Sequence, residues 1–419
     1  MAEQTERAPD GDGGGAAVRS LTSNRSFLLF VATRFFNMFG TQALTVVVGW
    51  QVYQLTGNPF DLGIVGLSQF APVLALFLVA GYAADLFDRR TILVACNIAH
   101  ALVAAALFAF SASDLSIVWP IFAILVVNGG ARGFFQPSSQ AILPSIVAPR
   151  HFPNAVALTS SITKAAQLIG PAGGGLLLAA MGESVYLVIL AVFILGALSA
   201  GLIAVPLAIR SPESTGLNTI FQGLGFIWRK KIVLGAISID LVAVLFGGVM
   251  GMLPVFASDI LHVGPGGLGV MRAMPAVGAL AVGIVLAQIS SPGRMGRVLF
   301  ASLALFGVSV VVFSLSTVFW LSIAALAAYG AADMISVYVR QTLTQIATPD
   351  EMRGRVSAVN SVSITASNEL GDFRAGVMAA AIGTVPAVLF GGVVTLGAAG
   401  LWWRLFPELR RVDRLDTYK

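Results

Sequence analysis

The sequence predicts an all-α integral membrane protein with twelve transmembrane helices in two pseudo-symmetric bundles of six. Of its 419 residues, 57% are hydrophobic and only 11% are charged, and the mean hydropathy is +0.87; a soluble domain has roughly 25% charged residues. The apolar residues form long uniform runs, unlike the alternating strands of a membrane barrel. A local pattern also recurs in the two halves of the chain. The composition excludes a soluble enzyme, a secreted disulfide scaffold or a nucleic-acid-binding module as the main body of the molecule.

The chain begins with a polar, Gly-rich stretch, residues 1–25, which lacks the apolar core of a signal peptide. Its composition is typical of a disordered tail, and we expect it to lie in the cytoplasm. The single cysteine, Cys96, permits no disulfide within the chain and no cysteine metal site. We therefore expect neither a metal nor a cofactor.

Twelve apolar segments follow, and most reach the ~20 residues that a helix needs to cross about 30 Å of hydrocarbon. Six lie within residues 26–209 and six within residues 232–406, which defines an N-terminal and a C-terminal bundle. The segments are 26–53, 62–84, 92–110, 117–142, 152–180, 185–209, 232–256, 268–289, 298–315, 319–346, 356–382 and 387–406.

A polar linker, residues 210–231, separates the two bundles. Its sequence LNTIFQGLGFIWRKK predicts an amphipathic helix that lies on the cytoplasmic face. Residues 407–419 form a second tail. Lys and Arg gather in both tails, in the linker and in alternate loops, whereas the opposite loops, such as TGNPFD, SASDLS, MGES and GTVP, contain none. Because cytoplasmic loops accumulate positive charge, both termini are predicted to be cytoplasmic. The basic balance therefore reflects insertion into a lipid bilayer, and we expect no nucleic-acid partner.

The chain repeats itself at an offset of 200 residues. APRHFPNAVALTSS, from Ala148, aligns with TPDEMRGRVSAVNS, from Thr348, so that Pro149 falls on Pro349. The first pattern joins segments four and five and the second joins segments ten and eleven, as a duplication of six helices requires. Parallel repeats of this kind are typical of a class of secondary transporters.

Ionisable side chains inside membrane spans are costly, and they normally face the bundle interior or a wet cavity. The ones inside the predicted spans, apart from Arg404 at the cytoplasmic end of segment twelve, are Arg34, Arg132, Lys164, Asp240, Arg272, Asp333, Arg340, Glu369, Asp372 and Arg374. Segments three, six, nine and twelve have none of these, so we expect these four to face lipid and the others to surround a polar interior.

Five of these residues are expected to line a substrate cavity. They are Arg34, Arg132, Asp240, Asp333 and Arg272. Arg34 and Asp240 lie at similar depths in the first helix of their halves, so we expect them to face one cavity and to be coupled. Arg340 follows Asp333 by seven residues on one helical face. An ion pair between these two residues that only compensates their burial, without contacting substrate, is an equal alternative there.

Glu369 and Asp372 share one helical face at a spacing of three residues. Two neighbouring carboxylates resist being ionised together, which suits a proton carrier. Arg132 is the expected opposing charge. The alternative is that Lys164 or Arg374 neutralises both acids permanently.

The stretch GYAADLFDRR, residues 81–90, follows the second segment and contains Gly81, Asp85, Arg89 and Arg90. It resembles the cytoplasmic signature of the major facilitator superfamily, with Asp88 where the broad pattern usually has Gly. The resemblance implies a conformational lock, in which the Gly permits close helix approach and the Asp accepts hydrogen bonds at a helix end.

Two further fragments resemble the same family. NGGARG places Arg132 where the family has a fourth-helix Arg, often linked to proton transfer. GPAGGGLL, starting at Gly170, resembles the fifth-helix signature of proton-coupled exporters. Small residues, here Gly170 and Gly174, let helices cross closely and Pro171 weakens the local helix, so we expect a pivot at the contact between the halves. Generic small-residue packing is the alternative. No strand precedes these glycines, which excludes a dinucleotide fingerprint.

Longer stretches, among them FVATRFFNMFG, EMRGRVSAVNSV and NELGDFRAG, look like a bacterial branch that contains enterobactin-type siderophore exporters and macrolide-efflux relatives. The resemblance covers residues 26–409. It implies a location in the bacterial inner membrane, alternating access, and proton-coupled export of a small amphipathic organic molecule, siderophore-like or drug-like, by a chain that is self-sufficient as a monomer.

Other functions remain open at this point. An importer, a uniporter or a lipid flippase has the same fold, and dependence of export on a pH gradient discriminates among them. A membrane-embedded enzyme needs clustered ligands, yet His100, His151 and His262 are far apart in the sequence, and no GxxxxGK[ST] nucleotide site exists. We therefore expect no catalytic residues. A pure scaffold or receptor has little reason to keep so many ionisable residues inside its spans.

Overall fold

The computed structural model describes residues 21–113, 117–204, 217–288 and 294–412. Most of the predicted tails, 1–25 and 407–419, and the first part of the predicted linker fall outside these ranges. The first half of the chain contains α2 (Arg25–Thr56), α3 (Pro59–Leu86), α4 (Arg89–Ser111), α5 (Trp119–Ile146), α6 (Phe152–Met181) and α7 (Val185–Gly201). The second half contains α9 (Lys231–Gly247), α11 (Gly264–Gln288), α12 (Met295–Leu315), α13 (Phe319–Ala347), α14 (Asp350–Ile382) and α15 (Thr384–Leu405).

These twelve long helices match the twelve predicted segments, and the described residues contain no strand. Nine helical stretches in the described residues are long and apolar enough to cross a membrane. One of these stretches, Pro149–Gly201, contains both α6 and α7. Helices α5 and α14 complete the set of twelve. The all-α membrane fold that the sequence predicts is confirmed.

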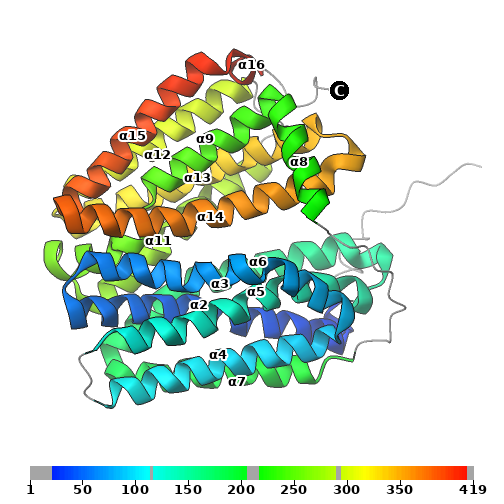
Figure 1. Cartoon of the computed structure of the whole chain (residues 1–419), viewed down its shortest axis with the longest axis vertical. Helices are drawn as coiled ribbons and strands as arrows, with labels where there is room; N and C mark the ends of the chain where they lie inside the picture. The colour runs from blue at the N-terminus through cyan, green and yellow to red at the C-terminus, as the bar shows by residue number, and fades with distance from the viewer. Residues whose placement is uncertain (1–20, 114–116, 205–216, 289–293, 413–419) are drawn as a thin grey trace, which may run out of the picture.

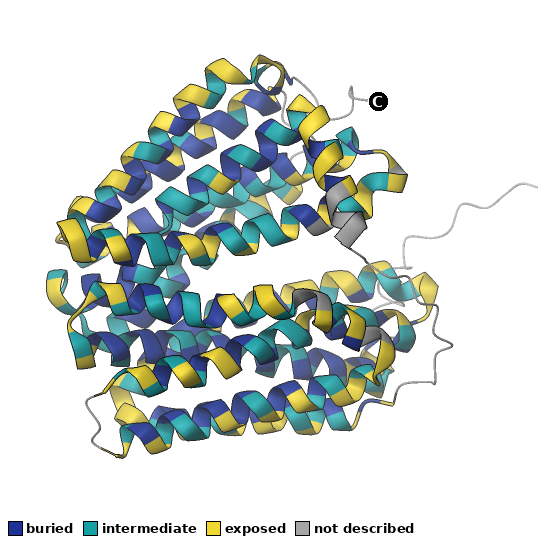
Figure 2. Ribbon diagram, in the orientation of Figure 1, coloured by how far each residue is buried: buried dark blue, intermediate teal, exposed yellow. Residues whose placement is uncertain are grey.

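The helices form two groups of six that face each other (Figure 1). Helices α4 and α7 lie at the outer edge of the first group, and α12 and α15 at the outer edge of the second. These are the four helices expected to face lipid. Exposed positions run along these helices (Figure 2), and they include large apolar residues such as Leu102, Leu198 and Val393. A membrane protein exposes such side chains where lipid replaces water as the solvent.

The two ends of the molecule differ in what they contain. One end holds the short helices α8 (Leu217–Arg229) and α16 (Pro407–Arg410), and we call it the α8 end (Figure 1). At the opposite end, the far end, the chain turns at Gly57, Gly182 and Gly383. Gly57 has φ 60° and donates its N–H to the Tyr53 carbonyl at 2.8 Å, which closes α2. Only glycine adopts this left-handed conformation without strain.

The seventh predicted segment, 232–256, is not one continuous helix. Helix α9 ends at Gly247, and the chain continues through a 3₁₀ turn, η3 (Met250–Met252), the short α10 (Leu253–Val255) and a π-helical turn, η4 (Phe256–Ile260). The sequence there, GGVMGMLP, has three glycines and a proline, which weaken or interrupt an α-helix. Hydropathy alone does not register such a break. The break leaves backbone N–H and C=O groups of the second half outside the α-helical hydrogen-bond pattern.

Very close helix crossings occur at corresponding positions in the two halves. A Cβ added at Gly129 on α5 would lie 2.2 Å from the carbonyl oxygen of Gln69 on α3. In the second half, a Cβ added at Gly330 on α13 would lie 1.9 Å from the carbonyl oxygen of Pro275 on α11. Only glycine fits at either position. Helices α3 and α5 therefore cross as α11 and α13 do, and this agrees with the predicted duplication.

Candidate functional site

Polar contacts join the two halves at the far end. Tyr53, near the end of α2, donates its hydroxyl to the carboxylate of Asp259 in η4. One residue along the chain, the Gln54 side-chain amide donates to the Ser258 hydroxyl at 3.1 Å. Both bonds connect the first half with the second. We call this set of four residues the far-end latch.

Close backbone contacts reinforce this closure. A Cβ added at Gly376 on α14 would lie 2.9 Å from the Cα of Gly63 on α3. A Cβ added at Gly175 on α6 would lie 2.6 Å from the Cα of Gly269 on α11, and one added at Gly269 would lie 2.7 Å from the Pro171 carbonyl oxygen. Small residues allow membrane helices to approach this closely. The closest of these backbone contacts join α3 with α14 and α6 with α11.

The predicted pivot on α6 needs a correction. A Cβ added at Gly170 would lie 2.8 Å from the Cβ of Gln42, and one added at Gly174 would lie 2.7 Å from the Cα of Ala43. Both partners are on α2, so Gly170 and Gly174 pack within the first half. The contact between the halves falls on the adjacent helical face, at Pro171 and Gly175. Of the three predicted residues, Pro171 alone contacts the other half, because the composition of α6 does not specify its rotation.

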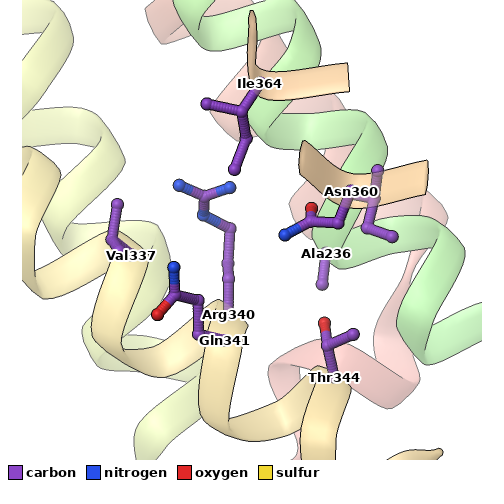
Figure 3. A pocket seen from close by; sticks show the side chains of 8 residues that line it. Ala236, Val337, Arg340, Gln341, Thr344, Asn360 and Ile364 are labelled. Atoms are coloured by element: carbon purple, nitrogen blue, oxygen red, sulfur yellow. The ribbon is translucent and has the colours of Figure 1, made fainter. Parts of the chain in front are cut away.

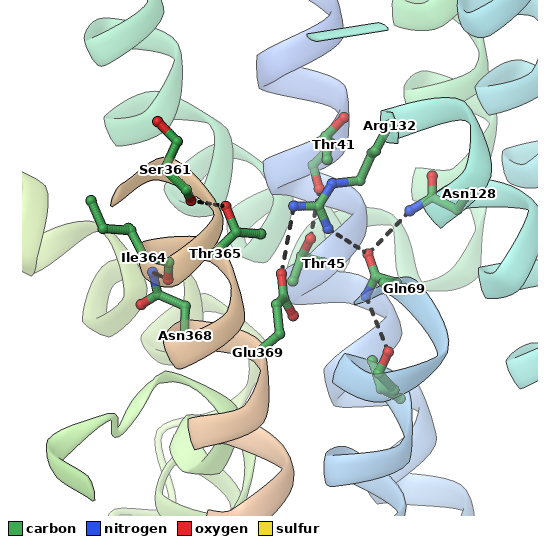
Figure 4. Close-up of polar contacts among 11 residues, drawn as sticks. Thr41, Thr45, Gln69, Asn128, Arg132, Ser361, Ile364, Thr365, Asn368 and Glu369 are labelled. Carbon is green, nitrogen blue, oxygen red and sulfur yellow. Dashed lines mark hydrogen bonds and ion pairs between the residues drawn. The ribbon is translucent and has the colours of Figure 1, made fainter. Parts of the chain in front are cut away.

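An ion pair joins the halves near the middle of the molecule. Arg132 Nη2 on α5 lies 3.6 Å from Glu369 Oε1 on α14 (Figure 4), and the exposed fractions of the two side chains are 35% and 19%. Arg132 Nη1 also donates to Gln69 Oε1 at 3.4 Å, and the same oxygen accepts a hydrogen bond from Asn128 Nδ2 at 3.1 Å. Gln69 and Asn128 are buried. The two amides thus hold Arg132 in position opposite Glu369.

Gln69 and Asn128 are not among the residues predicted from the sequence to line the cavity, because both side chains are neutral. A signal was nevertheless present, because each amide lies inside a long apolar segment, at LSQFAP and VVNGG. Buried amides need partners within the protein, so they tend to mark polar networks.

Asp372 and Arg272 meet at the broken part of the seventh segment. Asp372 Oδ1 on α14 accepts a hydrogen bond from the backbone N–H of Gly251 at 3.0 Å. Arg272 Nη1 on α11 donates to the carbonyl of the adjacent residue, Met250, at 3.4 Å. The break after α9 therefore supplies both partners, and it places an acid and a base on two sides of one turn.

The two acids of α14 consequently have different surroundings. Glu369 contacts a cation of the other half, whereas Asp372 contacts the backbone of its own half. Arg374 donates to the Leu245 and Phe246 carbonyls of α9, at 2.9 Å and 2.7 Å. A third hydrogen bond goes from Arg374 Nη1 to Met378 Sδ at 3.1 Å, so none of these three bonds of Arg374 reaches the acids. Lys164 is exposed on α6.

Asp240 forms an ion pair with Arg340, which lies on α13. Both side chains are buried, and Arg340 Nε also donates to the Ser336 hydroxyl at 3.1 Å. The sequence suggested different pairs, Asp240 with Arg34 or Arg340 with Asp333. In the structure Arg34 lies half-buried on α2, in the other half, and Asp333 lies half-buried on α13. Depth along a helix was predictable, but which face each helix turns to its neighbour was not.

A cavity of about 10 Å³ adjoins this buried pair (Figure 3). Besides Arg340, its polar lining consists of Gln341, Thr344 and Asn360. A space of this size holds about one water molecule when polar groups surround it. The pair thus has a small polar environment inside the second half.

The signature at residues 81–90 lies at the α8 end. The Asp88 side chain caps α4 by accepting from the backbone N–H of Arg90 at 3.2 Å. Arg89 Nη1 donates to the Ala141 carbonyl of α5 at 2.7 Å. These bonds lie within the first half, so they hold α4 against α5.

Gly81 and Asp85 of the signature both lie in the C-terminal part of α3. A Cβ added at Gly81 would meet nothing within 4 Å, so the close helix approach expected there is not present in this conformation. Asp85 lies in the last turn of α3, and its side chain falls outside the described part of the structure.

Polar side chains remain exposed on α14 toward the α8 end. Ser361, Thr365 and Asn368 are exposed, and Figure 4 shows Thr365 pointing toward α2. Exposed polar groups on a membrane-spanning helix are favourable where they meet water rather than lipid. Helix α14 thus contacts the first half closely at the far end, whereas toward the α8 end its polar side chains are exposed and Thr365 lies on the side that faces α2.

Metal and cofactor sites were not expected from the sequence. Among the residues that the structure describes, no group of three or more His, Cys, Asp or Glu is placed to hold a metal ion. His100 is buried, lies 3.2 Å from Asn37 Nδ2 and stacks on the Phe193 ring with 5.0 Å between centroids. Its contacts are thus those of a side chain packed in the first half.

A family model described as "Transmembrane secretion effector", one of the major facilitator models, matches residues 20–418 of the chain. The match covers all twelve long helices. The chain belongs to the major facilitator superfamily. It is therefore a membrane transporter of the family that the motifs resemble, and that resemblance is confirmed.

Several transporters of this superfamily are similar in sequence. The uncharacterized MFS-type transporter YfiS of Bacillus subtilis is 25% identical over 394 residues, 88% of this chain and 90% of YfiS. The multidrug efflux pump Tap of Mycolicibacterium fortuitum is 25% identical over 407 residues, 89% of this chain and 94% of Tap. The enterobactin exporter EntS of Citrobacter koseri is 23% identical over 411 residues, 93% of this chain and 94% of EntS.

Solved structures agree on the fold. A mutant of the nucleoside transporter NupG superposes with a TM-score of 0.72 at 12% sequence identity, covering 91% of this chain and 100% of that chain. At this identity the likeness concerns the major facilitator fold alone. It supports two bundles of six helices in one chain.

Proposed function

We propose that this transporter exports a small amphipathic organic molecule, siderophore-like or drug-like, across the bacterial inner membrane in exchange for protons. The observation that carries the proposal is the ion pair between Arg132 and Glu369, because it links the two halves at mid-molecule beside a water-exposed face of α14. Similar transporters that are named for the export of drugs or enterobactin support this direction and class of substrate. One chain supplies both halves of the site, so a monomer suffices.

The geometry supports alternating access. The α8 end is cytoplasmic in this proposal because the Lys and Arg residues gather there. The structure then has its far end closed and its cytoplasmic side open. On this side a proton leaves Glu369 or Asp372 for the cytoplasm, and the ionised Glu369 pairs with Arg132. Substrate then enters from the α8 end and competes with this pair. The halves then close at the α8 end and open at the far end, where protonation restores the starting state.

The signature residues Gly81, Asp85, Asp88, Arg89 and Arg90 act as the lock of the closed α8 end in this cycle. In the structure, the hydrogen bonds of Asp88 with Arg90 and of Arg89 with the Ala141 carbonyl join residues of the first half. Substituting Asp85→Asn is expected to slow turnover and to spare substrate binding, because the lock acts on the conformational step. Wild-type turnover, or a loss of affinity alone, would contradict this role.

Transport into proteoliposomes tests the proposal. Purified protein is reconstituted with a panel of catecholate siderophores and amphipathic drugs, with and without an imposed pH gradient. We expect substrate movement that requires the gradient in the wild type and is lost in Glu369→Gln. Glu183→Gln, which changes an exposed carboxyl in the turn before α7, is the matched control and should transport normally. Transport that ignores the gradient would favour a uniporter or flippase instead.

A further inference from the structure

Helix α8 ends where the second half enters the membrane. Only Lys230 separates it from α9, which begins at Lys231 and continues as a membrane-spanning helix. Figure 1 shows α8 crossing the ends of α9 and α14 rather than running along them. The C-terminal part of α8 therefore lies at the level of the lipid headgroups on the α8 side of the bilayer.

One face of α8 is fixed to the protein. Gly223 and Ile227, one turn apart, are both buried. A Cβ added at Gly223 would lie 2.7 Å from the carbonyl oxygen of Arg355 on α14, and Ile227 packs in an apolar cluster with Val356 and Val359. Helix α8 is thus docked on the first turns of α14, the helix that also contains Glu369.

An adjoining face of α8 is apolar and uncovered. Leu224 and Trp228, also one turn apart, have exposed fractions of 40% and 67%. Directly after Trp228 come three exposed basic residues, Arg229, Lys230 and Lys231. Trp favours the membrane–water interface, since one part of the ring is apolar and the other forms hydrogen bonds. Clustered Lys and Arg beside a membrane attract anionic lipids.

We propose that α8 is a binding site for anionic phospholipids. Leu224 and Trp228 enter the boundary between headgroups and acyl chains, and the three basic residues bind the lipid phosphates. Each basic residue strengthens such an association roughly fivefold, so the three act together. The α8 end also has two exposed basic residues at the start of α12. Arg294 is the N-cap residue of that helix and Arg297 lies in its first turn. That pair lies outside the apolar face of α8 and offers a matched control.

Quenching of Trp228 fluorescence tests the site. The full-length protein is reconstituted in phosphatidylcholine vesicles with an equal minor fraction of either brominated phosphatidylglycerol or brominated phosphatidylcholine. The difference between wild type and Trp228→Phe isolates the signal of this residue. We expect brominated phosphatidylglycerol to quench Trp228 several-fold more strongly than brominated phosphatidylcholine, and added salt to reduce the difference.

Two variants, each examined with and without Trp228→Phe, decide the role of the basic residues. Arg229→Gln/Lys230→Gln/Lys231→Gln should lose the preference for phosphatidylglycerol and retain the weak quenching by either lipid. Arg294→Gln/Arg297→Gln should keep the preference. The proposal is wrong if both lipids quench the wild type equally, if neither quenches Trp228, if the triple variant keeps its preference, or if the control pair loses it equally. None of these results depends on transport, so the test is separate from that of the proposed function.

Discussion

Arg132 is a single side chain that contacts both halves of the transporter, because its guanidinium reaches Gln69 on α3 and Glu369 on α14. The pair with Glu369 is partly exposed, so water weakens it relative to a fully buried pair. Such a pair can break and re-form during a cycle. The hydrogen bond to Gln69, a buried amide of the same half, keeps Arg132 in place when it does.

The first prediction concerns this pair. Arg132→Gln and Glu369→Gln should each reduce transport strongly, and the double variant should be little worse than the more severe single one. Residues in contact show coupling of about 1 kcal/mol, roughly a fivefold departure from additivity. The measurement is the initial rate of substrate uptake in a double-variant cycle, normalised to reconstituted protein. Independent, multiplicative losses would show that the two residues act separately.

The second prediction concerns Asp240 and Arg340, which are buried together within the second half. Asp240→Asn or Arg340→Gln should each lower stability by about 3–5 kcal/mol, because one charge is left buried without its partner. The double variant should recover much of this loss. Thermal unfolding in detergent measures it. Arg34→Gln is the control: its effect should simply add to that of Asp240→Asn, and coupling between these two would support the pairing suggested by sequence over the one in the structure.

At the scale of single helices, the close crossings limit which substitutions the helices tolerate. Gly330 on α13 touches the Pro275 carbonyl of α11, and no larger residue fits there. We expect Gly330→Val to abolish the folded protein, since a side chain would overlap backbone rather than a movable side chain. Gly397→Val on α15, where a Cβ would meet nothing within 4 Å, should be tolerated. Size-exclusion profiles of the two variants measure this, and equal yields of folded protein would contradict it.

The helices were largely predictable from the sequence, and their mutual rotation was not. Hydropathy and charge give the twelve segments and the four outer helices because lipid selects composition directly. The end of α9 at Gly247 was not predicted from hydropathy, because the residues around it are apolar. The ion-pair partner of Asp240 was not predicted for a different reason. Asp240 and Arg340 are 100 positions apart and meet only after their two helices have packed, and the sequence pattern of one helix does not specify that packing.

At the scale of the whole molecule, the contacts between the halves are unequal at the two ends. The far end has the latch and two close backbone crossings, whereas α14 exposes Ser361, Thr365 and Asn368 toward the α8 end. Two rigid halves that turn about the middle can close only one end at a time. Weakening contacts at the far end should therefore favour closure at the α8 end.

The last prediction tests this balance through the latch. Tyr53→Phe removes the hydroxyl that bonds Asp259 and leaves the ring in place. Loss of one hydrogen bond of about 1 kcal/mol should shift the population of far-end-open molecules roughly fivefold. A cysteine introduced as Thr365→Cys reports the shift, because the native Cys96 is buried and should not react. Alkylation of the introduced cysteine should slow in the Tyr53→Phe background, since closure at the α8 end covers position 365. Tyr186→Phe is the matched control, because the Tyr186 hydroxyl donates to Gln51 within the first half at 2.5 Å. If both tyrosine variants slow alkylation equally, the effect belongs to the far end in general and the latch does not govern the opening of the transporter.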